Sequence, residues 1–242
     1  TNERAFEAYI EDVMLGASGW KQGMVAEWDK SIALFPAQVC GFLKETQPKE
    51  WAELAKLLGA DLEGSLIATL VKELDSKGSL AVLRHGFKFY GKTLRLAYFK
   101  PAHGANTEVV RLYGLNRLHV TRQIPCHPND NSTIDMLLSV NGLPVATIEL
   151  KNPTTGQTWR DAVRQYKEDR LPGAPLFSFK KRALVHFAVD PNEVHMTSQL
   201  KGEKTFFLPF NRGSHPGAVC CGAGNPQHPS GHRTAYFWED VL

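Results

Sequence analysis

The 242-residue sequence predicts an α/β fold, with a helical part over about residues 1–78 and a sheet-containing part over about 79–242. Two observations predict it. Apolar residues recur with helical spacing through the first third, whereas from Ser79 they fall in short β-branched or aromatic runs bounded by Gly, Pro and Asn. A helical pattern returns at 159–170, before the apolar run 183–189. The length fits one large domain or two small ones, and we expect a single domain over 1–242.

Three helices are expected in the first third, each marked by apolar residues that share one face. The first ends near Gly16, the second begins after Pro48, and the third ends at Gly78, because Pro is favoured at helix starts and Gly at helix ends. Their apolar positions are Phe6, Ile10, Val13 and Met14; Trp51, Leu54, Ala55 and Leu58; and Leu62, Leu66, Ile67, Leu70, Val71 and Leu74.

Five runs have the composition and length of strands. They are LAVLR (80–84), KTLRLAYF (92–99), LHVTRQI (118–124), STIDMLLSV (132–140) and VATIELK (145–151). A helix at 159–170 and a strand at 183–189 follow, and residues 210–232 are a Gly/Pro/His-rich loop. The apolar end 235–242 has no terminating signal and the chain does not begin with Met, so we expect a fragment of a longer protein.

The composition is that of an ordinary globular chain, with 43 % hydrophobic and 22 % charged residues. No apolar run approaches the ~18 residues of a membrane span, and the start has no signal-peptide pattern. Four cysteines do not form a disulfide framework, so we expect a cytoplasmic protein without a membrane partner. The net charge of +3 permits a polyanionic partner without requiring one.

Two neighbouring strands carry the candidate site. Glu149 and Lys151 share one face at the end of the run 145–151, because side chains alternate along a strand. Asn141-Gly142 indicates a turn back to the strand that holds Asp135.

The length of this turn decides the pairing. A two-residue loop would pair Asp135 with Ile148 and put the acids on opposite faces. A three-residue loop (141–143), a five-residue loop (140–144) or one bulge would pair Asp135 with Glu149 instead. Because Pro144 has no N–H for a tight ladder, we favour the longer loops.

Paired carboxylates suit a divalent cation, since oxygen ligands of this kind bind Mg²⁺ or Mn²⁺. Next to a phosphodiester, such an ion neutralises charge and lowers the pKa of its bound water. Lys151 could orient that water, stabilise developing negative charge or act as a base. The alternative interpretation of Asp135, Glu149 and Lys151 is a salt bridge at the end of a strand.

The helix at 159–170 has two distinct faces. One is apolar and expected in the core: Trp159, Ala162, Val163 and Tyr166. The other is a basic stripe that could contact a nucleic-acid backbone: Arg160, Arg164 and Lys167. A solvated charged face explains the stripe equally simply. Arg122 and Gln123, at the end of an earlier strand, are expected to show ordinary strand-end polarity, with an approach to DNA as the alternative.

The order of several segments resembles a known family. These are FEAYIEDVML (6–15), VLRHGFKFYGKTLRLAYFKP (82–101), VTRQ (120–123), IDMLLSVNGLPVATIELKNP (134–153), DAVRQYKEDR (161–170), FFLPFNRG (206–213), GAGNP (222–226) and AYFWEDVL (235–242). The series resembles the N-terminal nuclease region of the restriction (R) subunit of type I restriction–modification enzymes. Glu-x-Lys alone is unspecific, but the ordered series covers most of the chain.

The resemblance implies the PD-(D/E)xK nuclease fold, a mixed sheet flanked by helices. It implies Asp135 and Glu149 as Mg²⁺ ligands and Lys151 as the catalytic lysine. In the family this domain cuts double-stranded DNA after translocation by an ATP-driven motor in the same polypeptide, so ATP would bind only the missing motor. Modification (methyltransferase) and specificity subunits complete the complex.

Two features depart from related nucleases or stay open. Many of those enzymes carry Gln-x-x-x-Tyr on the helix after the site; with Tyr166 as the tyrosine, the glutamine position holds Ala162, and Gln165 is the nearby glutamine. We expect Tyr166 and Gln165 on the DNA side. A first-helix glutamate often completes such sites, and the sequence does not choose between Glu7 and Glu11.

Two other motifs have simpler interpretations than a ligand-binding site. Gly86–Thr93 matches G-x-x-x-x-G-K-[ST], which would make an ATP-binding domain, but its aromatic interior alternates like a strand and favours a hairpin with Gly91 in the turn. A set of loop residues has loose zinc-ligand spacing without the usual Cys pair, so incidental histidines are expected: His215, Cys220, Cys221, His228 and His232.

The sequence therefore predicts a Mg²⁺-dependent DNA endonuclease domain. The alternative is a catalytically silent module of the same fold that links the motor to the methyltransferase core.

Overall fold

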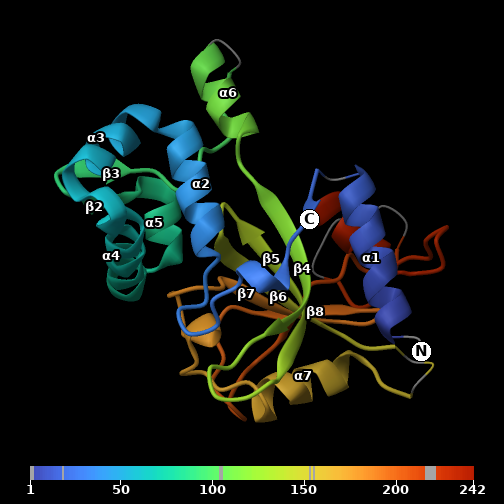
Figure 1. Ribbon diagram of the computed structural model, residues 1–242. Coiled ribbons are helices and arrows are strands. Elements are labelled where there is room, and N and C mark those ends of the chain that lie inside the picture. The colour runs from blue at the N-terminus through green and yellow to red at the C-terminus, as the bar shows by residue number, and fades with distance from the viewer. Residues whose placement is uncertain (1–2, 18, 104–105, 153, 155, 216–221) are drawn as a thin grey trace.

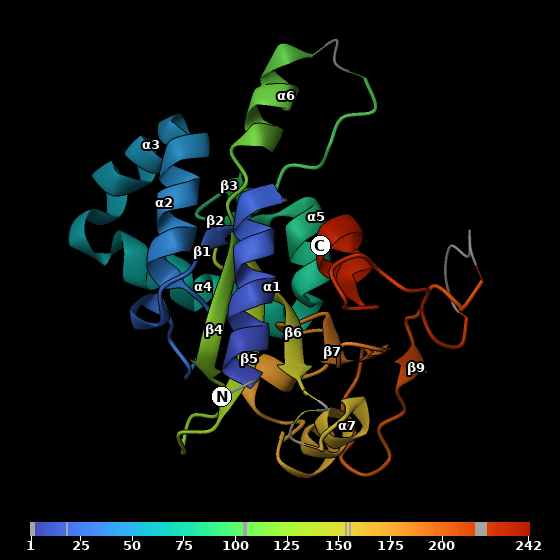
Figure 2. The same ribbon diagram turned by 90° about the vertical axis from the view of Figure 1, so that its right-hand side faces the viewer.

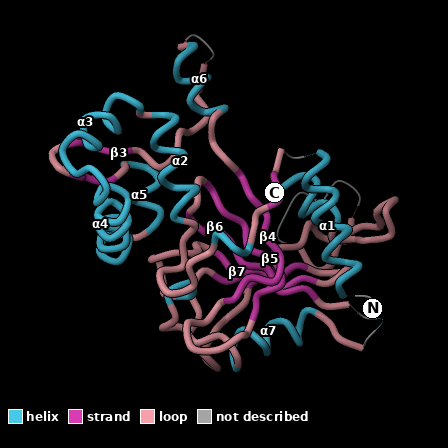
Figure 3. The backbone as a smooth tube through the Cα atoms, in the orientation of Figure 1, coloured by secondary structure: helices cyan, strands magenta, loops and turns pink. Residues whose placement is uncertain are grey.

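A seven-stranded mixed sheet forms the centre of the computed structural model, with helices against both faces (Figures 1 and 3). The structure describes residues 3–17, 19–103, 106–152, 154, 156–215 and 222–242. The strand order is β1-β4-β5-β6-β7-β8-β9. The β1–β4 and β6–β7 pairs are parallel and the others are antiparallel. The predicted α/β class, with a mixed sheet flanked by helices, is confirmed.

The main-sheet strands are β1 Lys21–Gln22, β4 Leu118–Pro125, β5 Thr133–Val140, β6 Leu143–Leu150, β7 Val185–Val189, β8 Val194–Thr197 and β9 Leu208–Pro209. The helices are α1 Glu3–Ala17, α2 Pro36–Thr46, α3 Pro48–Leu58, α4 Leu62–Lys77, α5 Ser79–His85, α6 Thr107–Gly114 and α7 Trp159–Glu168. A separate hairpin joins β2 Phe87–Phe89 to β3 Lys92–Leu94. Short turns of other helix types occupy 25–27, 59–61, 175–177 and 237–241.

Helix α6 projects from one end of the molecule, and the other helices form three groups around the sheet (Figures 1 and 2). Helix α1 covers one face with the C-terminal segment 237–241, burying Phe6, Ile10 and Met14 against β5 and β6. Helix α7 packs under the other face through Tyr166. Helices α2 to α5 form a lobe with its own leucine-rich core, which contacts the sheet at Leu143.

The predicted helices of the first third are confirmed as α1, α3 and α4, and their apolar stripes are largely buried. Helices α2 and α6 were not predicted. The α6 helix starts at Asn106, whose Oδ1 accepts hydrogen bonds from the backbone N–H groups of Glu108 and Val109. Asn106 was therefore a sequence signal for the start of a helix, since Asn is among the preferred capping residues.

The predicted strand at 80–84 is wrong, because these residues belong to helix α5. Gly78, with φ +85°, ends α4 and immediately begins the new helix. Val82 and Leu83 then pack into the leucine-rich core. A five-residue apolar run does not distinguish a buried strand from a buried helix by periodicity alone. The strand predicted at 92–99 is also shorter, ending at Leu94.

The Gly86–Thr93 match forms the β2–β3 hairpin, as predicted, with Gly91 at φ +76° in the turn. Phe87 and Phe89 are buried in the lobe. A phosphate-binding loop needs a strand before it and a helix after it. Here helix α5 precedes Gly86, and strand β3 stands where the helix should begin, so the ATP-binding interpretation is not supported.

The β5–β6 turn is the element that positions the candidate site. Asn141 and Gly142, with φ +53° and +88°, make a two-residue turn that pairs Val140 with Leu143. The longer loops favoured from the sequence are therefore wrong. Pro144 is compatible with the tight turn because it faces Ser139, in the pair next to Val140 and Leu143. In an antiparallel ladder, the pair next to a hydrogen-bonded pair exchanges no backbone hydrogen bonds, so no N–H is required of Pro144.

A bulge then restores the pairing that the candidate site needs. Ser139 faces Pro144 but Leu138 faces Ala146, so Val145 is the extra residue on β6. Met136 consequently faces Ile148. The same register places Asp135 opposite Glu149, which was the bulge alternative considered for the sequence.

Candidate active site

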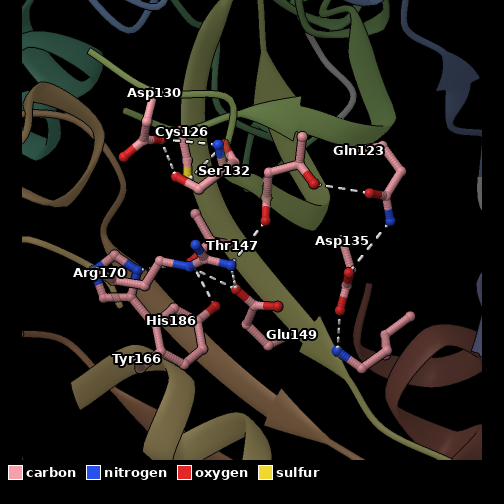
Figure 4. Close-up of polar contacts among 12 residues, drawn as sticks. Gln123, Cys126, Asp130, Ser132, Asp135, Thr147, Glu149, Tyr166, Arg170 and His186 are labelled. Carbon is pink, nitrogen blue, oxygen red and sulfur yellow. Dashed lines mark hydrogen bonds and ion pairs between the residues drawn. The ribbon is translucent and has the colours of Figure 1, made fainter. Parts of the chain in front are cut away.

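Asp135 and Glu149 lie side by side near the ends of β5 and β6 (Figure 4). Asp135 is half-buried and held through both oxygens: Oδ2 accepts a 2.7 Å hydrogen bond from the backbone N–H of Leu150, and Oδ1 accepts one of 3.3 Å from Gln123 Nε2. Its negative charge contributes to raising the pKa of Glu149, which places the two carboxylates within electrostatic reach of each other.

Glu149 is fully buried, and its two oxygens have different surroundings. Oε1 accepts hydrogen bonds from Arg170 Nε (2.8 Å) and Nη2 (2.6 Å). Oε2 is buried without a hydrogen-bond partner. Burial first, and the Asp135 charge second, raise the pKa of Glu149 well above its ordinary value, whereas Arg170 lowers it. An unsatisfied buried carboxylate oxygen is costly, and a cation beside it would remove that cost.

Arg170 is a site residue that the sequence analysis missed. It is 3 % exposed, and its Nη2 also donates to the Thr133 carbonyl oxygen (2.8 Å), so it joins Glu149 to the start of β5. Helical spacing offered no signal for it, because Arg170 lies beyond the end of α7 at Glu168. A buried charge needs a partner, and Glu149 provides it.

Lys151 directly follows β6, where its backbone N–H donates to the Val189 carbonyl oxygen (2.9 Å). Its side chain is mostly buried and borders a small surface hollow of about 160 Å³. Arg164 and Gln165 line the same hollow. The predicted lysine is thus brought beside the helix that carries the basic stripe.

The two first-helix glutamates are both buried under α1 but have different partners. Glu7 accepts hydrogen bonds from Arg122 Nη2 (3.1 Å) and from Gln123 Nε2 (3.0 Å). Glu11 accepts a hydrogen bond of 3.3 Å from Arg122 Nη1. Burial is the largest cause of the raised pKa of Glu7, and the Asp135 charge adds to it. Glu7 is therefore the first-helix glutamate linked to the carboxylate pair.

Tyr166 corrects one expectation, because it is fully buried and cannot contact DNA directly. Its side chain is 0 % exposed, and its hydroxyl is hydrogen-bonded to Thr147 Oγ1 (2.8 Å), which also contacts His186 Nδ1 (2.7 Å). Burial raises the pKa of Tyr166 well above its usual range and lowers that of His186 to about 3, so both rings are neutral. Tyr166 therefore links α7 to β6 through Thr147.

The basic stripe of α7 is present but uneven. Arg160 is exposed and lies over the Trp159 ring at 4.4 Å, and Arg164 is exposed and paired with Asp161 at 2.7 Å. Lys167 and Gln165 are half-buried. Trp159, expected in the core, is half-buried and stacks on His195 with ring centroids 3.5 Å apart.

The residues present fit a hydrated hard cation better than a closed metal cage. Within the described ranges, no three His, Cys, Asp or Glu side chains form a cluster suited to a metal ion. Mg²⁺ commonly uses one or two carboxylates and completes its shell with water and substrate phosphate. Asp135 and the unsatisfied Oε2 of Glu149 supply such a pair.

The zinc alternative finds no support among the described histidines. Cys220 and Cys221 lie outside the described residues. His228 Nε2 pairs with Glu239 at 3.2 Å, and the His232 ring packs against Phe6 and Tyr9.

The helix-flanked mixed sheet, with two carboxylates facing each other across adjacent strands, is consistent with a nuclease-like fold. The sequence model of the family described as type I restriction enzyme R protein N terminus matches residues 43–205. This is more than half of the chain, so the protein belongs to the family of type I restriction enzyme R protein N-termini. The match includes β4 to β8, α7, Asp135, Glu149 and Lys151, whereas α1 precedes it.

No curated protein matches the chain. None of the helices in the described ranges is long and apolar enough to cross a membrane.

Proposed function

We propose that this chain is the Mg²⁺-dependent endonuclease domain of a type I restriction enzyme R subunit, hydrolysing phosphodiester bonds of double-stranded DNA. The observation that carries the proposal is the buried Oε2 of Glu149, which has no hydrogen-bond partner and lies beside Asp135. The family membership independently supports a role in restriction.

Asp135 and Glu149 would hold the Mg²⁺ ion, with Mn²⁺ as an alternative and Glu7 as the first-helix residue nearest to them. When bound, the ion would neutralise phosphate charge and lower the pKa of a coordinated water. The Leu150 N–H fixes Asp135, and Arg170 fixes Glu149 so that its second oxygen stays available. These contacts orient the carboxylates before the substrate arrives.

Lys151 would act next to this pair, orienting the attacking water or stabilising negative charge that develops on the phosphate. Its side chain is largely buried and borders the hollow beside α7. Arg160, Arg164, Lys167 and Gln165 would contact DNA from α7, through the phosphate backbone rather than the bases. Such contacts carry little sequence information, which fits a domain whose recognition sequence is read by another subunit.

The remaining parts of the proposal follow from the family. The modification and specificity subunits are the expected protein partners, the motor that uses ATP would lie elsewhere in the R polypeptide, and the complex would act in the cytoplasm.

Lys151→Ala in the assembled restriction complex tests the proposal. The variant should translocate and hydrolyse ATP normally but lose DNA cleavage, because Lys151 takes part only in the chemical step. Lys49→Ala, at an exposed position on α3, is the control and should cut normally. Cleavage by the Lys151 variant at the rate of the unaltered complex would contradict the proposal and favour the silent docking module.

A further inference from the structure

Gln123 has a backbone conformation unlike that of its neighbours in β4. Its φ of +52° lies in the left-handed region, which costs a non-glycine residue free energy. The pairing continues on both sides, with Arg122 facing Met136 and Ile124 facing Ile134, so Gln123 stands opposite Asp135. Strained residues of this kind persist only where the surrounding structure holds them.

The face to which β4 and β5 direct their side chains changes at this point. Val120 and Met136 pack in the core under α1, whereas Ile124 and Ile134 pack in the core above α7. In a regular strand, residues two or four apart share a face. The switch falls at Gln123 and Asp135, and it allows Arg122 and Gln123 both to reach Glu7 on α1.

The side-chain amide of Gln123 joins three groups (Figure 4 shows two of these contacts). Its Nε2 donates to Glu7 Oε1 (3.0 Å) and to Asp135 Oδ1 (3.3 Å), and its Oε1 accepts from the Thr133 hydroxyl (2.9 Å). Ionised carboxylates only accept hydrogen bonds, so the amide nitrogen must face them. The Thr133 hydroxyl, which donates to the oxygen, is consistent with the same orientation.

We infer that Gln123 is a positioning residue that locks Asp135 in the orientation needed for the divalent cation and connects it to Glu7. The inference deepens the proposed function and rests on it. A neutral amide suits the task because it donates to two carboxylates at once without neutralising them. An arginine there would compete with the cation for both charges, and a glutamate would add a third negative charge.

The exposed position of Gln123 makes the inference testable, because removing its side chain leaves no cavity in the core. Gln123→Ala deletes the amide and keeps a strained backbone. Gln123→Gly deletes the amide and relieves the strain, since Gly adopts positive φ freely. Gln22→Ala, at an exposed position on β1, is the matched control.

Mn²⁺ titration by calorimetry, without DNA, measures the positioning role directly. Both Gln123 variants should bind Mn²⁺ about tenfold more weakly, which is typical when a partner of a metal ligand is lost. Gln22→Ala should bind normally, and the Gly variant should melt at a higher temperature than the Ala variant. Hydrogen exchange without metal should be faster in α1 of both Gln123 variants, because the link from Glu7 to Asp135 is broken.

The outcomes separate the inference from the proposed function. Normal Mn²⁺ affinity in both Gln123 variants would overturn the positioning role alone, as would full recovery in Gln123→Gly, which would assign the effect to the backbone. If the unaltered protein binds no Mn²⁺, both the metal-dependent function and the positioning role are overturned. Hydrogen exchange in α1 would still report whether Gln123 links Glu7 to Asp135.

Discussion

At the scale of single residues, the site depends on the balance of charge around Glu149. Burial and Asp135 favour its protonated form, and Arg170 favours the carboxylate. Neither Glu149 nor Arg170 has appreciable contact with water, so each depends on the other. Breaking such a pair by removing one partner leaves an uncompensated buried charge.

Arg170→Met should therefore destabilise the protein by about 3–5 kcal/mol, measured by urea unfolding at pH 7. Arg164→Met is the control, because Arg164 forms an exposed pair with Asp161 and such pairs contribute about 0–1 kcal/mol. Glu149→Gln combined with Arg170→Met should recover part of the loss. A cost below about 1 kcal/mol for Arg170→Met would show that Glu149 does not need the guanidinium.

The raised pKa of Glu149 also predicts a pH dependence. A carboxyl whose pKa is higher in the folded than in the unfolded protein binds more protons when folded, so its contribution to stability is lost as pH rises from 4.5 through the raised pKa. The free energy of unfolding of the metal-free protein should fall over this range, and the fall should be smaller in Glu149→Gln.

Mg²⁺ should counteract that loss, because the cation binds the ionised form. Unfolding curves from pH 4.5 to 8.5 with and without Mg²⁺ would measure it, and the stabilisation by Mg²⁺ should grow with pH. A stabilisation that is independent of pH would argue that the cation does not bind Glu149.

At the scale of secondary-structure elements, the β5–β6 hairpin brings the two acids together. Its turn needs Gly142 for two reasons: φ is +88°, and a Cβ atom there would lie 2.7 Å from the carbonyl oxygen of Phe35, just before α2. The backbone N–H of Phe35 donates to the Gly142 carbonyl oxygen at 3.0 Å, so the turn is clamped against the helical lobe.

Gly142→Ala should therefore cost clearly more than the ~1–2 kcal/mol expected for positive φ alone. Gly91→Ala isolates the conformational effect, since Gly91 also has positive φ but nothing lies near its missing Cβ. Thermal unfolding of both variants makes the comparison. Equal destabilisation would show that the turn relaxes away from Phe35.

The hairpin also shows how far the sequence could predict the site. Alternation placed Glu149 on its strand, and Asn141-Gly142 correctly indicated the turn. The choice between a longer loop and a bulge depends on how β6 packs against α2 and β7, which local pattern does not contain. For the same reason the left-handed Gln123 and the burial of Arg170, which lies beyond the end of α7, were not predicted.

At the scale of the whole molecule, segments far apart in sequence meet around the carboxylate pair. Helix α1 contributes Glu7, the centre of the chain contributes the acids, and the segment after α7 contributes Arg170. Helix α1 is held in place by the other end of the chain, since its core includes Trp238, and Trp20 Nε1 donates to the Leu242 carbonyl oxygen (2.7 Å). Most strands and the main helices followed from periodicity, and the mixed sheet followed from the resemblance to a known family, whereas this convergence required the tertiary structure.

The most direct test of the account is a crystal of the protein grown with Mn²⁺ and measured for anomalous scattering. We predict an anomalous peak within about 2.6 Å of an oxygen of both Asp135 and Glu149, with Glu149 binding through Oε2 while Oε1 stays on Arg170. The peak should be absent from crystals of Asp135→Asn. Ordered, ionised carboxylates without a peak between them, or a peak only at Glu7 and Glu11, would contradict the account.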